Sequence, residues 1–296
     1  MARRLLRLVA GVAIVIATAA MLRREYRTSP GVGAVARKFS YRGTERTYLL
    51  RAGSATSKTA LVLMLHGMGS TGALIERRSG FDSVAEGAGV VVAYPDASGE
   101  RWNDGFQNSS TDDVGFLSAL ADVLVAEFGI DTARVYAAGL SNGAMMVHRL
   151  GCQSDRFAAV AAVAGPMSPH AEERCSPGRP VSVIDFHGTD DRAVPYDERL
   201  TQTMRYWARR DGCLEPGEIS RLPDADPADG TRVRLEDHAR CRGGAEVALY
   251  TIEGGGHTWP GEAPRWTGWS GAVSRDVNAS ALLLQFFFAH PRISEP

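Results

Sequence analysis

The sequence lacks an excess of charge of either sign. Its 296 residues hold 33 Lys and Arg against 34 Asp and Glu, a formal net charge of −1. Because so balanced a chain has no surplus cations to neutralise phosphates, nucleic acid is not an expected partner. Apolar residues make up 44% and charged residues 23%. These values are close to the globular average and exclude a disordered tail or a multi-span membrane protein.

Long apolar runs are also scarce, and the N-terminus carries the one that suggests targeting. Three arginines precede 15 uncharged residues, Leu8–Leu22. The run suits a signal peptide and falls short of the roughly 20 apolar residues of a spanning helix. Ala17-Thr18-Ala19 offers a cleavage site. We expect 1–22 to be a signal peptide or short membrane anchor, 23–33 a linker and 34–296 a single domain outside the cytoplasm.

Cysteine is rare, and none of the four cysteines forms a CxxC motif. A zinc ribbon or a thioredoxin motif is therefore excluded. An even number of cysteines behind an export signal favours disulfides. We expect the sequential pairs Cys152–Cys175 and Cys213–Cys241, each worth roughly 3 kcal/mol for a loop of about 25 residues. The alternative is four buried thiols. The sequence also lacks a P-loop, an HExxH motif and clustered metal ligands, so no metal site is expected.

The hydrophobic pattern changes from alternating to continuous along the chain. Val35–Tyr41 and Arg46–Arg51 alternate around Arg42-Gly43-Thr44 and predict a β-hairpin. Continuous apolar runs, typical of strands buried on both faces, follow at Leu61–Leu65, Val90–Tyr94, Val135–Ala138, Ala158–Ala164, Val181–Phe186 and Val247–Ile252. Helices are expected at Asp113–Phe128, Ser141–Leu150, Tyr196–Arg210 and Asn278–His290.

This alternation predicts an α/β fold with a mostly parallel central sheet, helices on both faces and an N-terminal antiparallel hairpin. Residues 214–246 are polar and rich in Pro and Gly, and we expect them to form an irregular excursion held by the second disulfide.

Gly139-Leu140-Ser141-Asn142-Gly143 is a G-x-S-x-G motif between a predicted strand and a predicted helix. In α/β-hydrolases this turn exposes a strained, nucleophilic serine above the sheet. Gly139 and Gly143 lack Cβ atoms that would collide where strand and helix converge. The helix N-terminus also directs partial positive charge at the reacting centre. The motif therefore identifies Ser141 as the candidate nucleophile.

A serine hydroxyl needs a general base, and the histidine is expected last in chain order, after the acid. His257 lies in the loop after the last predicted strand, at the edge where α/β sites are built. His148 and His170 have no such placement. The acid should follow the preceding strand, where Asp190 and Asp191 stand side by side. Spacing alone does not choose between these two.

Two backbone N–H groups are expected to stabilise the oxyanion: those of Asn142 and Met68, the latter in the loop after Leu61–Leu65. The same loop begins a G-x-G-x-x-G, Gly67–Gly72, with Asp96 downstream, which formally matches a dinucleotide-binding fingerprint. The three later motifs, in the order of a hydrolase, favour the oxyanion role.

Four tryptophans fall in loops near the proposed site: Trp102, Trp259, Trp266 and Trp269. Trp102 and Trp259 are our candidates for substrate binding, as part of an aromatic wall around an apolar or aryl acyl group. The alternative is ordinary packing of loop tryptophans.

The motifs resemble those of the secreted polyhydroxybutyrate depolymerase-like and feruloyl-esterase-like α/β-hydrolases. The similar stretches, spread over residues 60 to 290, are Met64-Leu65-His66-Gly67, Tyr94-Pro95-Asp96, Arg101-Trp102-Asn103-Asp104, Asp112–Phe116, Gly139–Met145, His187–Tyr196 and Gly254–Gly261. The family's H-G-T-x-D-x-x-V-P pattern implies Asp191 as the acid. The resemblance also implies an α/β-hydrolase fold with no cofactor and no large lid domain.

These observations together predict an exported serine carboxylesterase for short-chain, hydroxyalkanoate or aryl (feruloyl-type) esters. Its expected partner is a small or oligomeric ester, with membrane contact only through the N-terminal segment. Oligomeric state is not determined by these patterns. Two alternatives stay open. One is an acyltransferase with the same triad. The other is an inactive exported binding protein, which the intact Ser, His and Asp disfavour.

Overall fold

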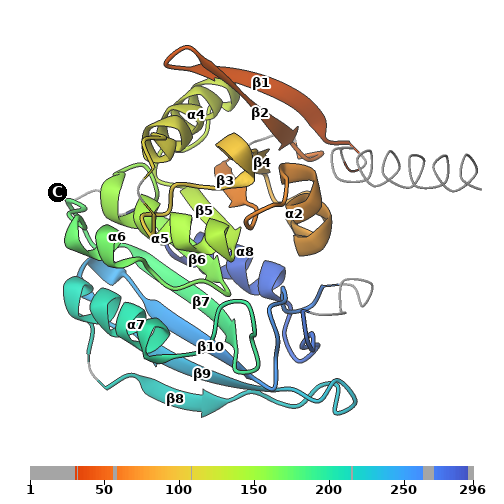
Figure 1. Cartoon of the computed structure of the whole chain (residues 1–296), viewed down its shortest axis with the longest axis vertical. Coiled ribbons are helices and arrows are strands. Elements are labelled where there is room, and N and C mark those ends of the chain that lie inside the picture. The colour runs from red at the N-terminus through yellow and green to blue at the C-terminus, as the bar shows by residue number, and fades with distance from the viewer. Residues whose placement is uncertain are drawn as a thin grey trace, which may run out of the picture.

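The computed structural model describes residues 31, 33–55, 59–107, 109–214, 216–262 and 270–292 (Figure 1). The expected signal or anchor at 1–22 and nearly all of the expected linker lie outside these residues, as do Trp266 and Trp269. Within the described part of the chain, no helix is both long enough and apolar enough to cross a bilayer.

Ten strands of the described residues form one sheet in the order β1-β2-β4-β3-β5-β6-β7-β10-β9-β8. Their bounds are Val35–Tyr41 (β1), Thr44–Arg51 (β2), Ala60–Leu65 (β3), Val90–Pro95 (β4), Val135–Leu140 (β5), Ala159–Val163 (β6), Ser182–Gly188 (β7), Glu218–Arg221 (β8), Arg232–His238 (β9) and Val247–Glu253 (β10). The six central strands, β4 to β10 in that order, are parallel, and both ends of the sheet are antiparallel. The predicted hairpin and mostly parallel sheet are thus confirmed.

Helices cover both faces of this sheet (Figure 1). They are α2 (Gly72–Ser79), α3 (Phe81–Ala85), α4 (Asp113–Phe128), α5 (Asn142–Gln153), α6 (Pro169–Glu173), α7 (Glu198–Asp211) and α8 (Ala279–Ala289), with 3-10 turns η1 (Ser98–Glu100) and η2 (Arg242–Gly244). Helices α4 to α7 pack on one face, and α2, α3 and α8 on the other. Because both faces are covered, every residue of β3, β4 and β5 is buried, which explains their unbroken apolar sequences.

The expectation of an irregular segment at 214–246 is wrong in part. β8 and β9 extend the sheet beyond β10, and Figure 1 shows β8 at the opposite end from the β1–β2 hairpin. All four residues of β8 are exposed and β9 is rich in charged residues, so neither strand has the apolar pattern by which buried strands are detected. Polar edge strands of this kind also resist pairing with other chains.

Both expected disulfides are present in the structure. Cys152, in α5, is bonded to Cys175, just after α6, and Cys213, just after α7, to Cys241, at the end of the β9 region. The sequence separations are 23 and 28 residues. The first disulfide links α5, the helix that follows Ser141, to the segment just after α6. The second links the end of α7 to the segment that follows β9.

Candidate active site

Ser141 lies at a sharp turn between β5 and α5, with φ 58° and ψ −120°. A positive φ is unusual for a residue with a Cβ, and such strain persists at functional sites when the surroundings enforce it. The surroundings here are closely packed. A Cβ on Gly139 would lie 2.5 Å from the carbonyl carbon of Gly143, and one on Gly143 would lie 2.4 Å from the oxygen of Leu65. The two glycines therefore let β3, β5 and α5 converge beneath the serine.

His257 follows β10, and its Nδ1 lies 2.7 Å from Oδ2 of Asp191, which follows β7. Because an ionised carboxylate only accepts hydrogen bonds, Nδ1 carries the proton and Nε2 presents a lone pair. The other oxygen of Asp191 accepts from the backbone N–H groups of Ala193 and Val194, each at 2.8 Å. The acid is thus held in place from both of its oxygens.

Burial alone would raise the pKa of Asp191. The hydrogen bond and charge of His257 and the bonds from Val194 and Ala193 outweigh it and hold that pKa below the usual value for aspartate. Asp190 is exposed, and its Oδ1 is 3.4 Å from the hydroxyl of Thr189. The structure therefore brings Asp191, and not Asp190, to the histidine, in agreement with the choice that the resemblance implied.

Ser141, His257, Met68 and Asn142 line one cavity of about 370 Å³. The loop after β3 lies against the serine, because a Cβ on Gly67 would be 3.3 Å from Cβ of Ser141. This loop and the first turn of α5 thus bring the Met68 and Asn142 segments to the same side of the cavity. Its apolar wall is formed by Ile75, Leu140, Met145, Ala193 and Val194.

A family model described as "Esterase PHB depolymerase" matches residues 45–193, which include β2 to β7, Ser141 and Asp191. The chain belongs to this esterase family. It is a carboxylic ester hydrolase with an α/β-hydrolase fold, as the sequence motifs predicted.

Curated relatives of this esterase carry related names. NocK of Nocardia uniformis subsp. tsuyamanensis, named as an esterase, is 31% identical over 88% of this chain and 85% of its own length. Feruloyl esterase B of Piromyces equi is 31% identical over 57% of this chain. The bifunctional acetylxylan esterase/xylanase XynS20E of Neocallimastix patriciarum is 27% identical over 67%. The matched regions are 34% and 28% of these last two proteins, so the chain matches only about a third of each.

Solved structures agree on the fold of the esterase. The acetyl xylan esterase from Aspergillus awamori superposes with a TM-score of 0.62 over 86% of this chain and 99% of that protein, at 15% identity. Esterase PE8 gives a TM-score of 0.52 over 80% of this chain, at 18% identity. At such low identity, the likeness concerns the fold alone.

The structure does not bring Trp102 and Trp259, the candidates for substrate binding, to the wall of the cavity. Their exposed fractions are 1% and 0%, and neither lines the cavity. The indole N–H of Trp102 donates to the carbonyl of His66, and that of Trp259 donates to the hydroxyl of Ser280. Both indole rings therefore hold neighbouring segments of the esterase in place. This agrees with the alternative interpretation, in which the loop tryptophans serve packing.

The glycine-rich loop forms hydrogen bonds that belong to the fold of the esterase. Thr71 caps α2, and the backbone N–H of Gly72 donates to Oδ1 of Asp96 at 2.8 Å. The other oxygen of Asp96 accepts from the hydroxyl of Thr47 at 2.7 Å. Both oxygens of the acid in the formal fingerprint are therefore bound within the protein. Among the described residues there is also no group of three or more His, Cys, Asp or Glu that could hold a metal ion.

Sequence reasoning missed Arg78 of α2, which holds the loop of His257. Its guanidinium donates to both oxygens of Glu262, at 2.6 and 3.1 Å, and to the carbonyl of His257 at 2.9 Å. The Glu262 side chain is fully buried. Arg78 stands in no recognised motif and is 179 residues from His257, so no local signal pointed to it.

A second missed network supports Asn142. Its carboxamide accepts from the backbone N–H of Trp102 at 2.8 Å and donates to Asp104 at 2.5 Å. Arg101 and Asp104 also line the cavity. These contacts join the Arg101-Trp102-Asn103-Asp104 stretch to the first residue of α5. They also keep the Asn142 N–H in position.

Proposed function

We propose that this esterase is a serine carboxylesterase in which Ser141 is the nucleophile, His257 the general base and Asp191 the residue that orients His257. One observation carries the proposal: the Asp191–His257 hydrogen bond leaves Nε2 of His257 open in the cavity that Ser141 also lines. All three residues follow strands of one sheet, at the edge where α/β sites are built. We accordingly treat 34–296 as one catalytic domain.

The reaction would follow the acyl-enzyme route. Ser141 Oγ attacks the ester carbonyl carbon while Nε2 of His257 takes the hydroxyl proton. The negative oxygen of the tetrahedral intermediate accepts from the N–H groups of Met68 and Asn142, at the positive end of α5. When the C–O bond breaks, His257 returns the proton to the leaving alcohol. Water then repeats the sequence on the acyl-enzyme and releases the acid, which restores Ser141.

The substrates we propose are short-chain, hydroxyalkanoate or aryl esters of the feruloyl type. The cavity volume of about 370 Å³ is near the lower end of the range for small-molecule sites. Its apolar side chains suit an acyl chain or a ring, and the names of the relatives include feruloyl and acetylxylan esterases. A panel of methyl ferulate, acetylated xylan and hydroxybutyrate oligomers would rank these classes by kcat/KM.

Replacement of Ser141 by Ala tests the assignment of the nucleophile. Removing it should lower kcat for p-nitrophenyl acetate and butyrate by about four orders of magnitude or more, leaving only the contribution of the oxyanion hole. Ser83→Ala, which changes an exposed serine of α3, is the matched control and should retain wild-type activity. If Ser141→Ala retained more than about a tenth of the activity, Ser141 would not be the nucleophile.

We further propose that the esterase is exported and works outside the cytoplasm. Two disulfides in a chain of this size support an oxidising compartment. Alkylation of the native, exported protein followed by intact-mass analysis should detect no free thiol. Reductant should lower Tm, because each bond closes a loop worth roughly 3 kcal/mol. Four alkylated cysteines in the native protein would contradict this location.

A further inference from the structure

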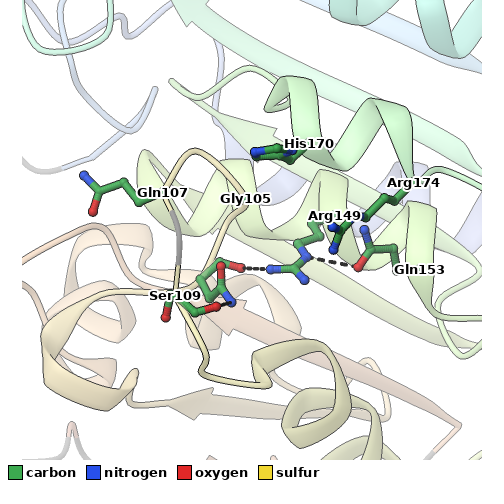
Figure 2. A pocket seen from close by; sticks show the side chains of 8 residues that line it. Gly105, Gln107, Ser109, Arg149, Gln153, His170 and Arg174 are labelled. Atoms are coloured by element: carbon green, nitrogen blue, oxygen red, sulfur yellow. Dashed lines mark hydrogen bonds between the residues drawn. The ribbon is translucent and has the colours of Figure 1, made fainter.

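A second pocket, of about 100 Å³, lies beside the loop that walls the catalytic cavity. Residues 101 and 104 line the cavity, whereas residues 103, 105, 107 and 109 line this pocket. Helices α5 and α6 complete it, and Figure 2 shows Arg149, Gln153 and Arg174 together on one side, with His170 beside them. At about 30 Å³ for each water, the pocket has room for a small polar group, but not for an acyl chain.

The pocket wall is rich in hydrogen-bond donors and contains no carboxylate. The guanidinium of Arg149 is fixed by two of its own bonds, to the carbonyl of Asn103 at 2.6 Å and to Oε1 of Gln153 at 3.0 Å (Figure 2). Because Oε1 of Gln153 is occupied in this way, its Nε2 is left buried without a hydrogen-bond partner among the described residues. A buried donor of this kind is a preformed place for an acceptor.

Carboxylates near the pocket have partners of their own. Asp113 is paired with Arg46 at 3.0 Å, Asp112 is paired with Arg42 at 3.1 Å, and Glu173 lies 3.3 Å from Nδ1 of His170, which lines the pocket. In the part of the chain that the structure describes, neither Arg149 nor Arg174 forms an ion pair. The two arginines are therefore positively charged side chains in a pocket whose described lining holds no carboxylate.

The pKa of Arg149 is lowered by burial and by the neighbouring Arg174, whereas the charges of Asp113, Asp104 and Asp112 raise it. Two guanidinium groups that repel each other in a partly enclosed site are stabilised when an anion lies between them.

We propose that this pocket is a subsite for a carboxylate carried by an acidic polysaccharide whose ester occupies the catalytic cavity. This inference rests on the proposed esterase function. It adds that the alcohol part of the ester substrate is an acidic polysaccharide. Arg149 and Arg174 match a carboxylate in planarity and charge. The NH2 group of Gln153 and the hydroxyl of Ser109 suit the hydroxyl groups of a sugar, whereas the NH2 group of Asn103 is already bonded to the carbonyls of Ser109 and Thr111.

The spacing of the two pockets places the carboxylate on the leaving polymer. Arg149 is eight residues beyond Ser141 along α5, which corresponds to about 12 Å at 1.5 Å per residue. An anion so far from the ester carbonyl belongs to a neighbouring unit of the chain. The polymer would therefore cross the loop of residues 101–109, with its acyl group in the cavity and its carboxylate in the pocket.

Binding of trigalacturonate at low salt, measured by calorimetry on the full exported protein, tests the subsite directly. The Arg174→Glu variant should weaken binding by about tenfold or more, since a charge-assisted bond is lost and the charge is reversed. Arg174 is exposed and makes no ion pair among the described residues, so the change should leave the fold intact. Arg205→Glu, an exposed arginine of α7 outside both pockets, is the matched control and should bind as the wild type does.

Two further probes identify the source of the anion. Neutral xylotriose should bind at least about tenfold more weakly than trigalacturonate, and inorganic phosphate likewise. Equal binding of xylotriose would show that the pocket does not recognise the negative charge of the ligand, and would overturn the proposal. Equal binding of phosphate would assign the pocket to a free anion and overturn the substrate role. Unchanged trigalacturonate binding in Arg174→Glu would overturn the subsite itself.

A kinetic comparison separates the failure of this inference from the failure of the proposed function. The ratio of kcat/KM for acetylated polygalacturonate to that for p-nitrophenyl acetate should fall about tenfold in Arg174→Glu, mainly through KM. If neither ester were turned over by the wild type, the esterase function would fail, while the calorimetry would still decide the pocket. If both were turned over and the ratio stayed constant, only the subsite would fail.

Discussion

Two His–Asp pairs among the described residues differ in their exposure and in the orientation of the imidazole. In the first, His257 and Asp191 lie on loops beside the cavity. In the second, His148 of α5 and Asp185 of β7 are both fully buried between helix and sheet, with Nε2 of the histidine 3.4 Å from Oδ2 of the aspartate. The two aspartates are only six residues apart in sequence.

The orientation of the imidazole separates the two pairs. His257 turns Nδ1 to its acid, so Nε2 is free for Ser141. His148 turns Nε2 to its acid, and its Nδ1 accepts from the indole N–H of Trp207 at 3.2 Å. His148 is fully buried, its Nδ1 is occupied, and its Nε2 forms no hydrogen bond among the described residues. A His–Asp pair becomes a catalytic element only where one nitrogen stays open to a cavity, and the other pair here joins α5 to the sheet.

Loss of the carboxylate at Asp191 should have the largest effect. Asp191→Asn cannot stabilise the imidazolium and favours the wrong tautomer, which lowered kcat by about 10⁴ in the well-studied serine protease. Steady-state hydrolysis of p-nitrophenyl butyrate measures this loss, and circular dichroism checks the fold. Asp190→Asn is the matched control and should be nearly silent, because Asp190 is exposed and does not contact His257. Equal, mild losses in both variants would point to another acid.

Breaking the buried pair should reduce stability and not chemistry. His148→Leu removes the imidazole beside Asp185, whose carboxylate forms no hydrogen bond among the described residues, and it also removes the acceptor of the Trp207 indole N–H. Removal of one member of a buried pair typically destabilises a protein by about 3–5 kcal/mol. Urea unfolding measures the difference, while kcat per folded molecule should stay close to that of the wild type. The double variant with Asp185→Leu also removes the buried carboxylate and should recover part of the stability, because Trp207 still lacks its acceptor. A kcat loss as large as that of Asp191→Asn would assign His148 a role in the reaction.

The smallest expected effect is a change in how the stability of Asp191→Asn depends on acid pH. Because the folded-state pKa of Asp191 is lowered, its carboxylate adds stability above the unfolded-state pKa of about 3.9, and this contribution is lost as pH falls through the folded value. The free energy of unfolding should therefore decline less between pH 5 and pH 3 in Asp191→Asn than in the wild type. Urea titrations at both values test this, and identical slopes would refute it.

The elements that sequence reasoning located best are those with a strong local cause. α4 was expected at Asp113–Phe128 and has these bounds, because Asp112 caps its start and Gly129 ends it in a left-handed conformation. The turn at Ser141 followed from the two glycines, whose Cβ atoms would collide with neighbouring backbone. Chain order then pointed to His257 and to the pair of candidate acids.

The other features of the site and the fold depend on tertiary contacts that cannot be recognised in the sequence. Which of Asp190 and Asp191 turns inward is decided by the N–H groups of Ala193 and Val194, and spacing alone left both open. Trp102 and Trp259 were placed near the site correctly but on the wrong side of its wall, because a loop has no periodicity that tells a buried face from an open one. β8 was missed because all of its residues are exposed.

Arg78 connects two parts of the candidate site that lie far apart in the sequence. The serine turn is built from neighbouring segments, but the base is held by a helix that lies 179 residues earlier in the chain. Contacts between such distant segments form late in folding, because long loops must close first. A chain that grows from its N-terminal end therefore contains Ser141 and Arg78 well before the segment around His257 that Arg78 holds. We expect esterase activity to appear only after that segment has docked.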